Sequence, residues 1–437
     1  MTTPAGQTEG TPANQESQGD KQTAKGVVTA EALDKTVFIG RQPIFDQRLD
    51  VYGYELLFRS GRENSFTGDD GDQATRVTIG NSLNIVGLGD VVGAKMVFFN
   101  ITRKLLLDEF YSVLPAGRAV VELLETVEPD EEVIGACEAL REEGYLLALD
   151  DFVFGPQYRP LLAMTDFVKV DFMATSREER RSLVEQFGRP GLSFVAERIE
   201  KPEEFEEAVA LGYRYFQGYF FCKPKIIEGR DIPGAKQKYL LLLQVVSGPT
   251  IDFNQMEKIV KSDGSLSVKL LRYLNSAALG MREKITSIKQ ALVLLGERPL
   301  RKWASLLALT CLADDKPSEL IRTSLARAQF CELLCEDLGL DGRQLDLFML
   351  GLLSALDALL DCPLSDVLAH LPLASDVKAT LLGNSTALGK IHMLVLACER
   401  GDWKTGSMLG RMLGLPEQRV ADVYTESLRW ADEVMCL

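Results

Sequence analysis

The feature that most constrains the fold is an alternation of short β-rich runs and amphipathic helical stretches between residues 37 and 218. The runs occupy residues 37–41, 51–57, 96–101, 119–123, 146–150, 167–170, 193–197 and 215–218. Helical patterns, for example over 131–143, 177–187 and 202–211, separate most of them. Eight such runs predict an α/β barrel of the β/α type. The first two runs lie too close together for a helical crossover, so we expect an antiparallel pair and an irregular barrel.

The second half of the chain shows a different pattern, because the β-rich runs stop after residue 224. Helical patterns then follow to the end, over 239–247, 254–262, 267–275, 287–295, 320–337 and 346–360. The first residues are polar and lack an apolar run, which is typical of a disordered tail. We therefore expect a disordered tail over 1–35, a barrel over 36–226, a linker over 227–238 and an all-α domain over 239–437.

Composition excludes several classes of function. The net charge of −15 disfavours non-specific binding to nucleic acid or to an anionic membrane surface. No apolar stretch is long enough to span a bilayer and no signal peptide is evident, so we expect a cytoplasmic protein. The chain has two histidines, His370 and His392, so a site built from several imidazoles is excluded. Cys331 and Cys335 share one helix face without partners for a metal site, which favours core packing.

Polar side chains stand at the C-terminal end of almost every expected strand. They are Glu55, Asn100, Glu122, Asp150, Asp151, Glu197 and Gln217, with Lys169 in the sixth run and Asp171 directly after it. Barrel active sites form at this rim, so we expect these groups to converge. Converging carboxylates repel one another unless cations intervene, and oxygen ligands without imidazole favour Mg²⁺ or Mn²⁺. The alternative interpretation of each residue is an isolated rim charge or a strand-end cap.

In this order the residues resemble the EAL-domain family, which comprises phosphodiesterases and receptors for the bacterial second messenger cyclic di-GMP. The matching segments are 41–44, 55–59, 99–101, 122–125, 150–152, 169–171, 196–200 and 217–220. The resemblance covers residues 36–226. The reaction of the family opens one phosphodiester bond of cyclic di-GMP and leaves the linear dinucleotide pGpG.

The resemblance implies a role for each matching residue. One Mg²⁺ or Mn²⁺ ion would be held by Glu55, Asn100, Glu122 and Asp150, and a second by Asp150, Asp151 and Glu197. The catalytic set would be Glu55, Lys169, Glu197 and Gln217, with Lys169 beside the attacking water and Gln217 positioning that water or the ligand. Gln42 and Arg59 match positions that contact the dinucleotide, and Arg59 is suited to a phosphate.

The chain departs from the family pattern in the segments that support these residues. Leu56 replaces the alanine of the Glu-Ala-Leu signature and adds bulk next to Glu55. After the paired aspartates, Val153 replaces a glycine, and Pro156 and Pro160 stiffen the loop and remove backbone donors. Glu125 stands where the family has the glutamate that anchors this loop. The threonine that precedes that glutamate in the family is replaced by Leu124. These changes favour slow or absent hydrolysis over full activity.

Residues 238–437 resemble the HDOD domain, an all-helical relative of the HD phosphohydrolases, most strongly before residue 305. Ser354 and Ala355 stand where those hydrolases carry their His-Asp pair, and His370 and His392 cannot supply the missing ligands. We therefore expect no metal site in this half, with both histidines packing against or capping helices.

Three functions remain open on this sequence. The barrel could bind and slowly hydrolyse cyclic di-GMP, or bind it without turnover, while the HDOD domain acts on an unidentified protein partner. In the third, the chain is a catalytically dead scaffold that works through protein–protein contacts alone. Barrels of this family often dimerise, so the resemblance also implies a homodimer.

Overall fold

The computed structural model describes residues 37–60, 89, 92–151, 155–223, 234–274 and 288–435. Residues 36–437 group into one compact unit, which contains both the barrel and the helical domain. Within the described part of the chain, no helix combines the length and the apolar character needed to cross a bilayer. The tail predicted over 1–35 and most of the linker predicted over 227–238 lie outside the described residues.

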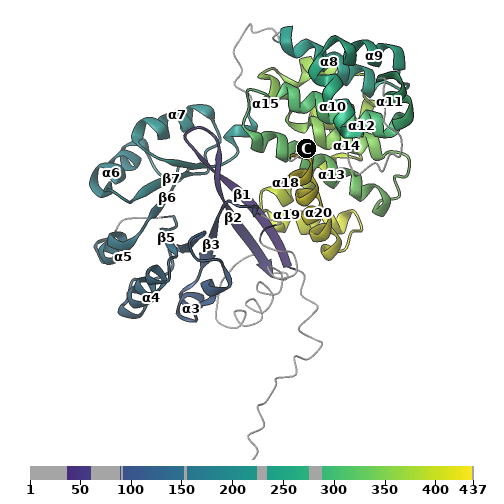
Figure 1. The fold of residues 1–437 in the computed structure, drawn as a ribbon. Coiled ribbons are helices and arrows are strands. Elements are labelled where there is room, and N and C mark those ends of the chain that lie inside the picture. Colours follow the sequence, from purple (N-terminus) through teal and green to yellow (C-terminus); the bar gives the residue numbers. More distant parts are fainter. Residues whose placement is uncertain are drawn as a thin grey trace, which may run out of the picture. The chain divides into compact units, whose positions relative to one another are not determined.

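The first half is a closed barrel of eight strands in sequence order, which confirms the predicted fold (Figure 1). The strands are β1 (Val37–Asp46), β2 (Val51–Ser60), β3 (Met96–Ile101), β4 (Ala119–Leu123), β5 (Leu146–Leu149), β6 (Phe167–Asp171), β7 (Ser193–Glu197) and β8 (Tyr215–Gln217). Strand β1 pairs antiparallel with both β2 and β8, and the other neighbours pair parallel. The described helices between the strands are α3 (Arg103–Leu107), α4 (Glu131–Glu142), α5 (Arg159–Met164), α6 (Arg177–Phe187) and α7 (Pro202–Leu211).

An irregularity in β2 decides which way its side chains face. Ile44 pairs with Gly53 and Phe45 with Val51, so Tyr52 has no partner opposite it. Such a bulge reverses the alternation of faces along the strand. Tyr52 lies against the cluster inside the barrel, and Glu55 beyond the bulge also faces the interior. Tyr54 and Leu56 consequently join the cluster outside the strands.

The barrel interior is layered because strand residues two apart face the same side. An apolar layer closes the middle of the barrel and consists of Ile44, Phe98, Val120, Ala148, Phe167 and Val195. The residue two positions further toward the rim in five of these strands is polar, and the five are Asn100, Glu122, Asp150, Lys169 and Glu197. The fold thus places a water-excluding apolar floor directly beneath the predicted site.

The second half is helical, as predicted. Its helices are α8 (Gly234–Ser247), α9 (Phe253–Ser262), α10 (Gly264–Leu274), α11 (Ile288–Leu295), α12 (Glu297–Leu312), α13 (Ser318–Asp337), α14 (Gln344–Leu352), α15 (Leu356–Leu360), α16 (Leu364–Ala369), α17 (Ser375–Leu381), α18 (Gly389–Glu399), α19 (Trp403–Met412) and α20 (Glu417–Met435). Cys331 and Cys335 are buried and free, in agreement with core packing.

Helix boundaries differ from the predicted ones, most clearly at two places. Helix α8 begins at Gly234, within the segment expected to be linker. The single helix predicted over 346–360 is interrupted by a 3₁₀ turn at Leu353–Ala355. There the Ser354 hydroxyl donates to the Gly351 carbonyl at 2.7 Å, and serine bonding to its own backbone competes with the regular helical ladder.

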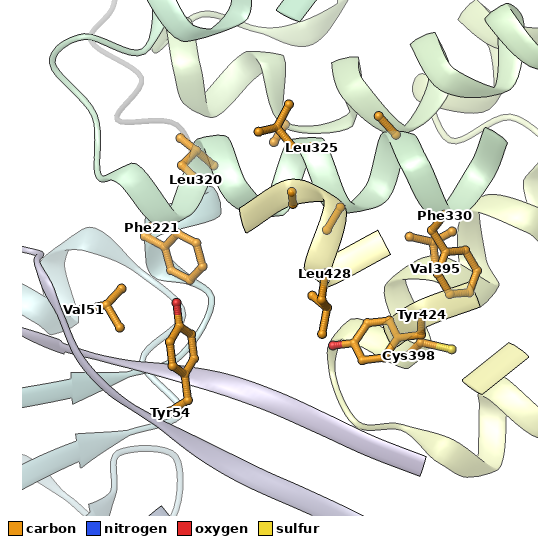
Figure 2. Close-up of a cluster of buried hydrophobic side chains, with 14 of the residues drawn as sticks. Val51, Tyr54, Phe221, Leu320, Leu325, Phe330, Val395, Cys398, Tyr424 and Leu428 are labelled. Carbon is orange, nitrogen blue, oxygen red and sulfur yellow. The ribbon is translucent and has the colours of Figure 1, made fainter. Parts of the chain in front are cut away.

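The helical domain contacts the outer surface of the β1–β2 hairpin. The Tyr54 hydroxyl donates to Glu319 Oε2 and accepts from Arg322, both at 2.9 Å. Arg41 lies over the Tyr54 ring and pairs with Asp432 of α20. Figure 2 shows Tyr54 and the barrel residue Phe221 facing α13 and α20, where apolar side chains of both halves form one cluster. Apolar burial and buried polar pairs therefore join the two domains.

Replacing Tyr54 with Phe should test this interface, because Glu319 is buried and would lose a hydrogen-bond donor. We expect a loss of about 1–3 kcal/mol in the free energy of unfolding, measured by urea denaturation. Tyr145→Phe is the control, since the Tyr145 hydroxyl bonds to the Leu114 carbonyl within the barrel. Limited proteolysis should release separate domains faster in Tyr54→Phe than in Tyr145→Phe. Equal cleavage of the two variants would contradict a joining role for Tyr54.

Candidate active site at the barrel rim

The site is built around the ammonium group of Lys169, whose side chain is 1% exposed. Its Nζ lies 2.8 Å from Glu197, 3.0 Å from Glu122, and 3.1 Å from both Asp150 and Glu55. Five strands carry these side chains to one point, as predicted from their positions at strand ends. Four carboxylates around one ammonium leave a formal charge of −3 when all are ionised, so the cluster favours further cations or protons.

Glu55 is the most firmly held carboxylate. Asn100 donates to its Oε1 at 2.7 Å, while Gln217 and Lys169 donate to its Oε2 at 2.7 and 3.1 Å. Burial alone would raise the pKa of Glu55, but Lys169 and these donors outweigh it and lower the pKa. Glu55 is therefore ionised and fixed in orientation.

Two other carboxylates respond in the opposite direction. Burial raises the pKa of Glu122 well above its usual range, and the attraction of Lys169 does not compensate. Burial also raises the pKa of Glu197 to about 8, with Asp150 and Glu55 adding repulsion. For Lys169, burial would lower the pKa, but the surrounding carboxylates hold it well above its usual range. Without a metal, the cluster thus combines a charged lysine and an ionised Glu55 with carboxyl groups whose pKa is raised, at Glu122, Glu197 and Asp150.

Local backbone geometry positions the remaining rim residues. Asp151 and Arg198 directly follow site residues and have φ of 42° and 53°, a left-handed conformation that is uncommon outside glycine. Arg198 pairs with Asp171 at 2.9 Å. Gly218 follows Gln217, and a Cβ there would lie 2.1 Å from the Ile199 carbonyl, so only glycine permits this approach. These turns explain how successive residues reach the same mouth.

The residues present fit divalent cations. Asp150, Asp151 and Glu197 each offer an oxygen, and the three oxygens lie within 4.8 Å of one another. Buried Asn100 Oδ1 and Glu122 Oε2 have no hydrogen-bond partner among the described residues. Buried oxygens without a hydrogen-bond partner destabilise the fold, and oxygens of this kind are the ligands that hard cations prefer. This donor set, which holds no imidazole, suits Mg²⁺ or Mn²⁺.

The residues predicted to contact the dinucleotide are only partly described. Gln42 lies at the site, where its Oε1 accepts from Gln217 at 2.9 Å. Arg59 belongs to β2, but its side chain lies outside the described residues. Glu125 is exposed, and its backbone carbonyl accepts from the Tyr158 hydroxyl at 3.5 Å.

Three of the residues that depart from the family pattern can be followed in the described structure. Leu56 is 1% exposed and packs outside the strands, so its bulk does not crowd Glu55. Pro156 begins a 3₁₀ helix (Pro156–Tyr158), and Pro160 lies in the first turn of α5. At both positions a missing N–H breaks no helical hydrogen bond. Val153 lies outside the described residues.

The helical half carries a different arrangement at the position of the expected His-Asp pair. Arg327 donates to the Ser354 hydroxyl at 3.0 Å and to both oxygens of Glu399 at 2.6 and 2.7 Å. Among the described residues, the metal-ligand grouping is the barrel one alone. His370 is the C-cap of α16, and burial lowers the pKa of His392 in α18 to about 4.

Removing the Lys169 charge should expose the cost of the buried carboxylates. In EDTA, Lys169→Met should lower the free energy of unfolding by about 3–5 kcal/mol, because the carboxylates lose their counter-charge. Glu122→Gln is the matched variant: it imitates the protonated form and should be at least as stable as the wild type at pH 8. Urea denaturation measures both, and a Lys169→Met protein as stable as the wild type would contradict this charge balance.

The same carboxylates predict the pH dependence of the metal-free protein. A carboxyl whose folded pKa is raised keeps its proton after the unfolded chain has released it, so stability falls as pH rises. The decline should run from the ordinary glutamate pKa near 4.3 to about 8, the folded value of Glu197. Glu122→Gln should make it shallower.

Comparisons with known proteins identify two domains in this chain. An EAL-domain model matches residues 94–224, and an HDOD-domain model matches residues 232–366. The uncharacterised protein YuxH of Bacillus subtilis is 34% identical over 91% of this chain and 99% of its own length. The protein CdgJ of Vibrio cholerae, named a cyclic di-GMP phosphodiesterase, is 36% identical over 91% of this chain and 93% of its own length.

Among solved structures, BlrP1 of Klebsiella pneumoniae in complex with calcium and cyclic di-GMP is 22% identical, with a TM-score of 0.36. That match covers 43% of this chain and 55% of the other. The two domain matches and the relatives aligned over nearly their full length lead to one conclusion: the chain belongs to the family of proteins in which an EAL domain is followed by an HDOD domain.

Proposed function

We propose that this chain is a cyclic di-GMP signalling protein whose barrel binds the dinucleotide with Mg²⁺ or Mn²⁺ and hydrolyses it slowly to pGpG. The observation that carries the proposal is the convergence of four carboxylates within 3.1 Å of Lys169 Nζ, those of Glu55, Glu122, Asp150 and Glu197. The relative CdgJ, aligned over almost the whole chain, is named a phosphodiesterase for this ligand. Both support phosphodiester chemistry at the rim.

The side chains divide the work according to their geometry. Glu55, Asn100, Glu122 and Asp150 would hold one cation, and Asp150, Asp151 and Glu197 the other. Bound cations would neutralise the carboxylates and stabilise negative charge on the reacting phosphate. Lys169, charged and directed into the cluster, would donate a hydrogen bond to the attacking water or to a phosphate oxygen. Gln217 keeps Glu55 in orientation and would position the ligand together with Gln42.

The reaction requires water to attack one phosphorus atom. A new P–O bond forms while the P–O3′ bond breaks, and the released 3′ oxygen takes a proton that the water supplies. One of the two phosphodiester bonds then remains, which gives pGpG.

Slow turnover is proposed because the support of the site differs from that of the family pattern. Leu124 replaces a threonine, and the Glu125 carboxylate, the expected loop anchor, is exposed. When the residues that support the metal ligands are altered, the catalytic rate falls before the affinity for the ligand does. We further propose that the helical domain carries the output to a protein partner, because it contacts the hairpin that bears Gln42 and Glu55.

Product analysis after long incubation with Mn²⁺ tests turnover. The wild type should convert cyclic di-GMP to pGpG, and Glu55→Ala and Lys169→Ala should each lower the rate at least about 100-fold. Glu143→Ala is the control, since Glu143 is exposed at the C-cap of α4 and should leave the rate unchanged. Binding without product would favour a receptor, and neither binding nor product would favour a scaffold. Either result would overturn the proposed hydrolysis.

A further inference from the structure

The corner between α18 and α19 of the helical domain lies against the barrel at a residue of the site. The Arg400 carbonyl accepts a hydrogen bond from Gln42 Nε2 at 3.1 Å, across 358 residues of sequence. Gln42 Oε1 accepts from Gln217, which also donates to Glu55. Three hydrogen bonds thus connect the helical domain to the central glutamate of the barrel.

Small residues on both sides permit this close approach. A Cβ on Gly40 in β1 would lie 2.6 Å from the Trp403 ring, at the start of α19. Gly401 has φ of +67°, and a Cβ there would lie 2.4 Å from Leu57 Cδ1. Because Gly40 and Gly401 have no side chain, the corner between α18 and α19 can pack closely against β1 and β2. The contact is therefore part of the packing between the domains, and it fixes where residue 400 sits.

The Arg400 side chain makes a second contact with the barrel, at Tyr219. Its Cζ lies 5.2 Å from the centroid of the Tyr219 ring, two residues beyond Gln217. Arg400 is exposed, and within the part of the chain that the structure describes its charge helps to lower the pKa of Glu200 and Asp402 without forming an ion pair with either. A planar guanidinium stacked on an aromatic ring keeps its N–H groups available, and those groups match the geometry of a phosphate.

We infer that Arg400 of the helical domain is a ligand-binding residue of the barrel, and that its guanidinium contacts a phosphate of the bound dinucleotide. This inference rests on the proposed function, because it assumes that the barrel holds an anionic dinucleotide. The barrel itself is rich in carboxylates, so a cation placed beside its mouth by the other domain adds attraction where the ligand enters. Ligand binding and docking of the two domains then stabilise each other.

The test measures binding of fluorescently labelled cyclic di-GMP by anisotropy, with the full-length chain in Ca²⁺. Arg400→Ala should weaken binding about tenfold, the loss of one charge-assisted hydrogen bond. Arg400→Lys should retain part of the affinity. Because Arg400→Ala keeps the backbone carbonyl, the Gln42 contact persists and the variant isolates the guanidinium. Affinity should also depend less steeply on salt concentration in Arg400→Ala than in the wild type.

Arg411→Ala is the matched control. Arg411 is exposed in α19 and donates to the Ser407 carbonyl of its own helix, so its removal should leave affinity unchanged. Each variant should unfold at the same temperature as the wild type, which shows that folded proteins are being compared.

The outcomes separate this inference from the function on which it rests. If the wild type binds cyclic di-GMP and Arg400→Ala binds it with equal or higher affinity, the inference is overturned and the proposed function stays intact. A wild type that fails to bind overturns both. If Arg411→Ala weakens binding as much as Arg400→Ala does, the effect comes from the net charge of the protein, and the inference is overturned as well.

Discussion

The balance between one buried ammonium and four carboxylates is the interaction on which the rest of the barrel depends. Lys169 is almost wholly buried, and in the metal-free protein it supplies the counter-charge to Glu55, Glu122, Asp150 and Glu197. The balance is incomplete, because burial still raises the pKa of Glu122 and Glu197. A site with surplus negative charge and unpartnered oxygens is prepared for divalent cations.

The fold creates this site through alternation along strands. An apolar layer fills the barrel, and the polar layer lies two residues further along most of the same strands. The bulge at Tyr52 is essential to the pattern, because it turns Glu55 inward and Tyr54 outward. One irregularity thus serves both domains: the inward residue binds the site lysine, and the outward one bonds to Glu319 and Arg322 of the helical domain.

Much of the barrel site could be predicted from the sequence, since carboxylates at the ends of regularly spaced β-rich runs must meet at one rim. The interface between the domains could not. Tyr54 and Glu319 are 265 residues apart, and neither has a local pattern that identifies its partner. The outward direction of Leu56 depends on a bulge that strand propensity does not reveal. The break at Ser354 depends on hydrogen bonds, one of them from Arg327 of another helix.

The central claim is that cations and the rim carboxylates together create the dinucleotide site. Isothermal titration of the wild-type chain with cyclic di-GMP, in Mn²⁺ and again in EDTA, tests it most directly. We expect binding in Mn²⁺ that is lost in EDTA, because the carboxylates around Lys169 then repel the phosphates. Equally tight binding in EDTA would contradict it.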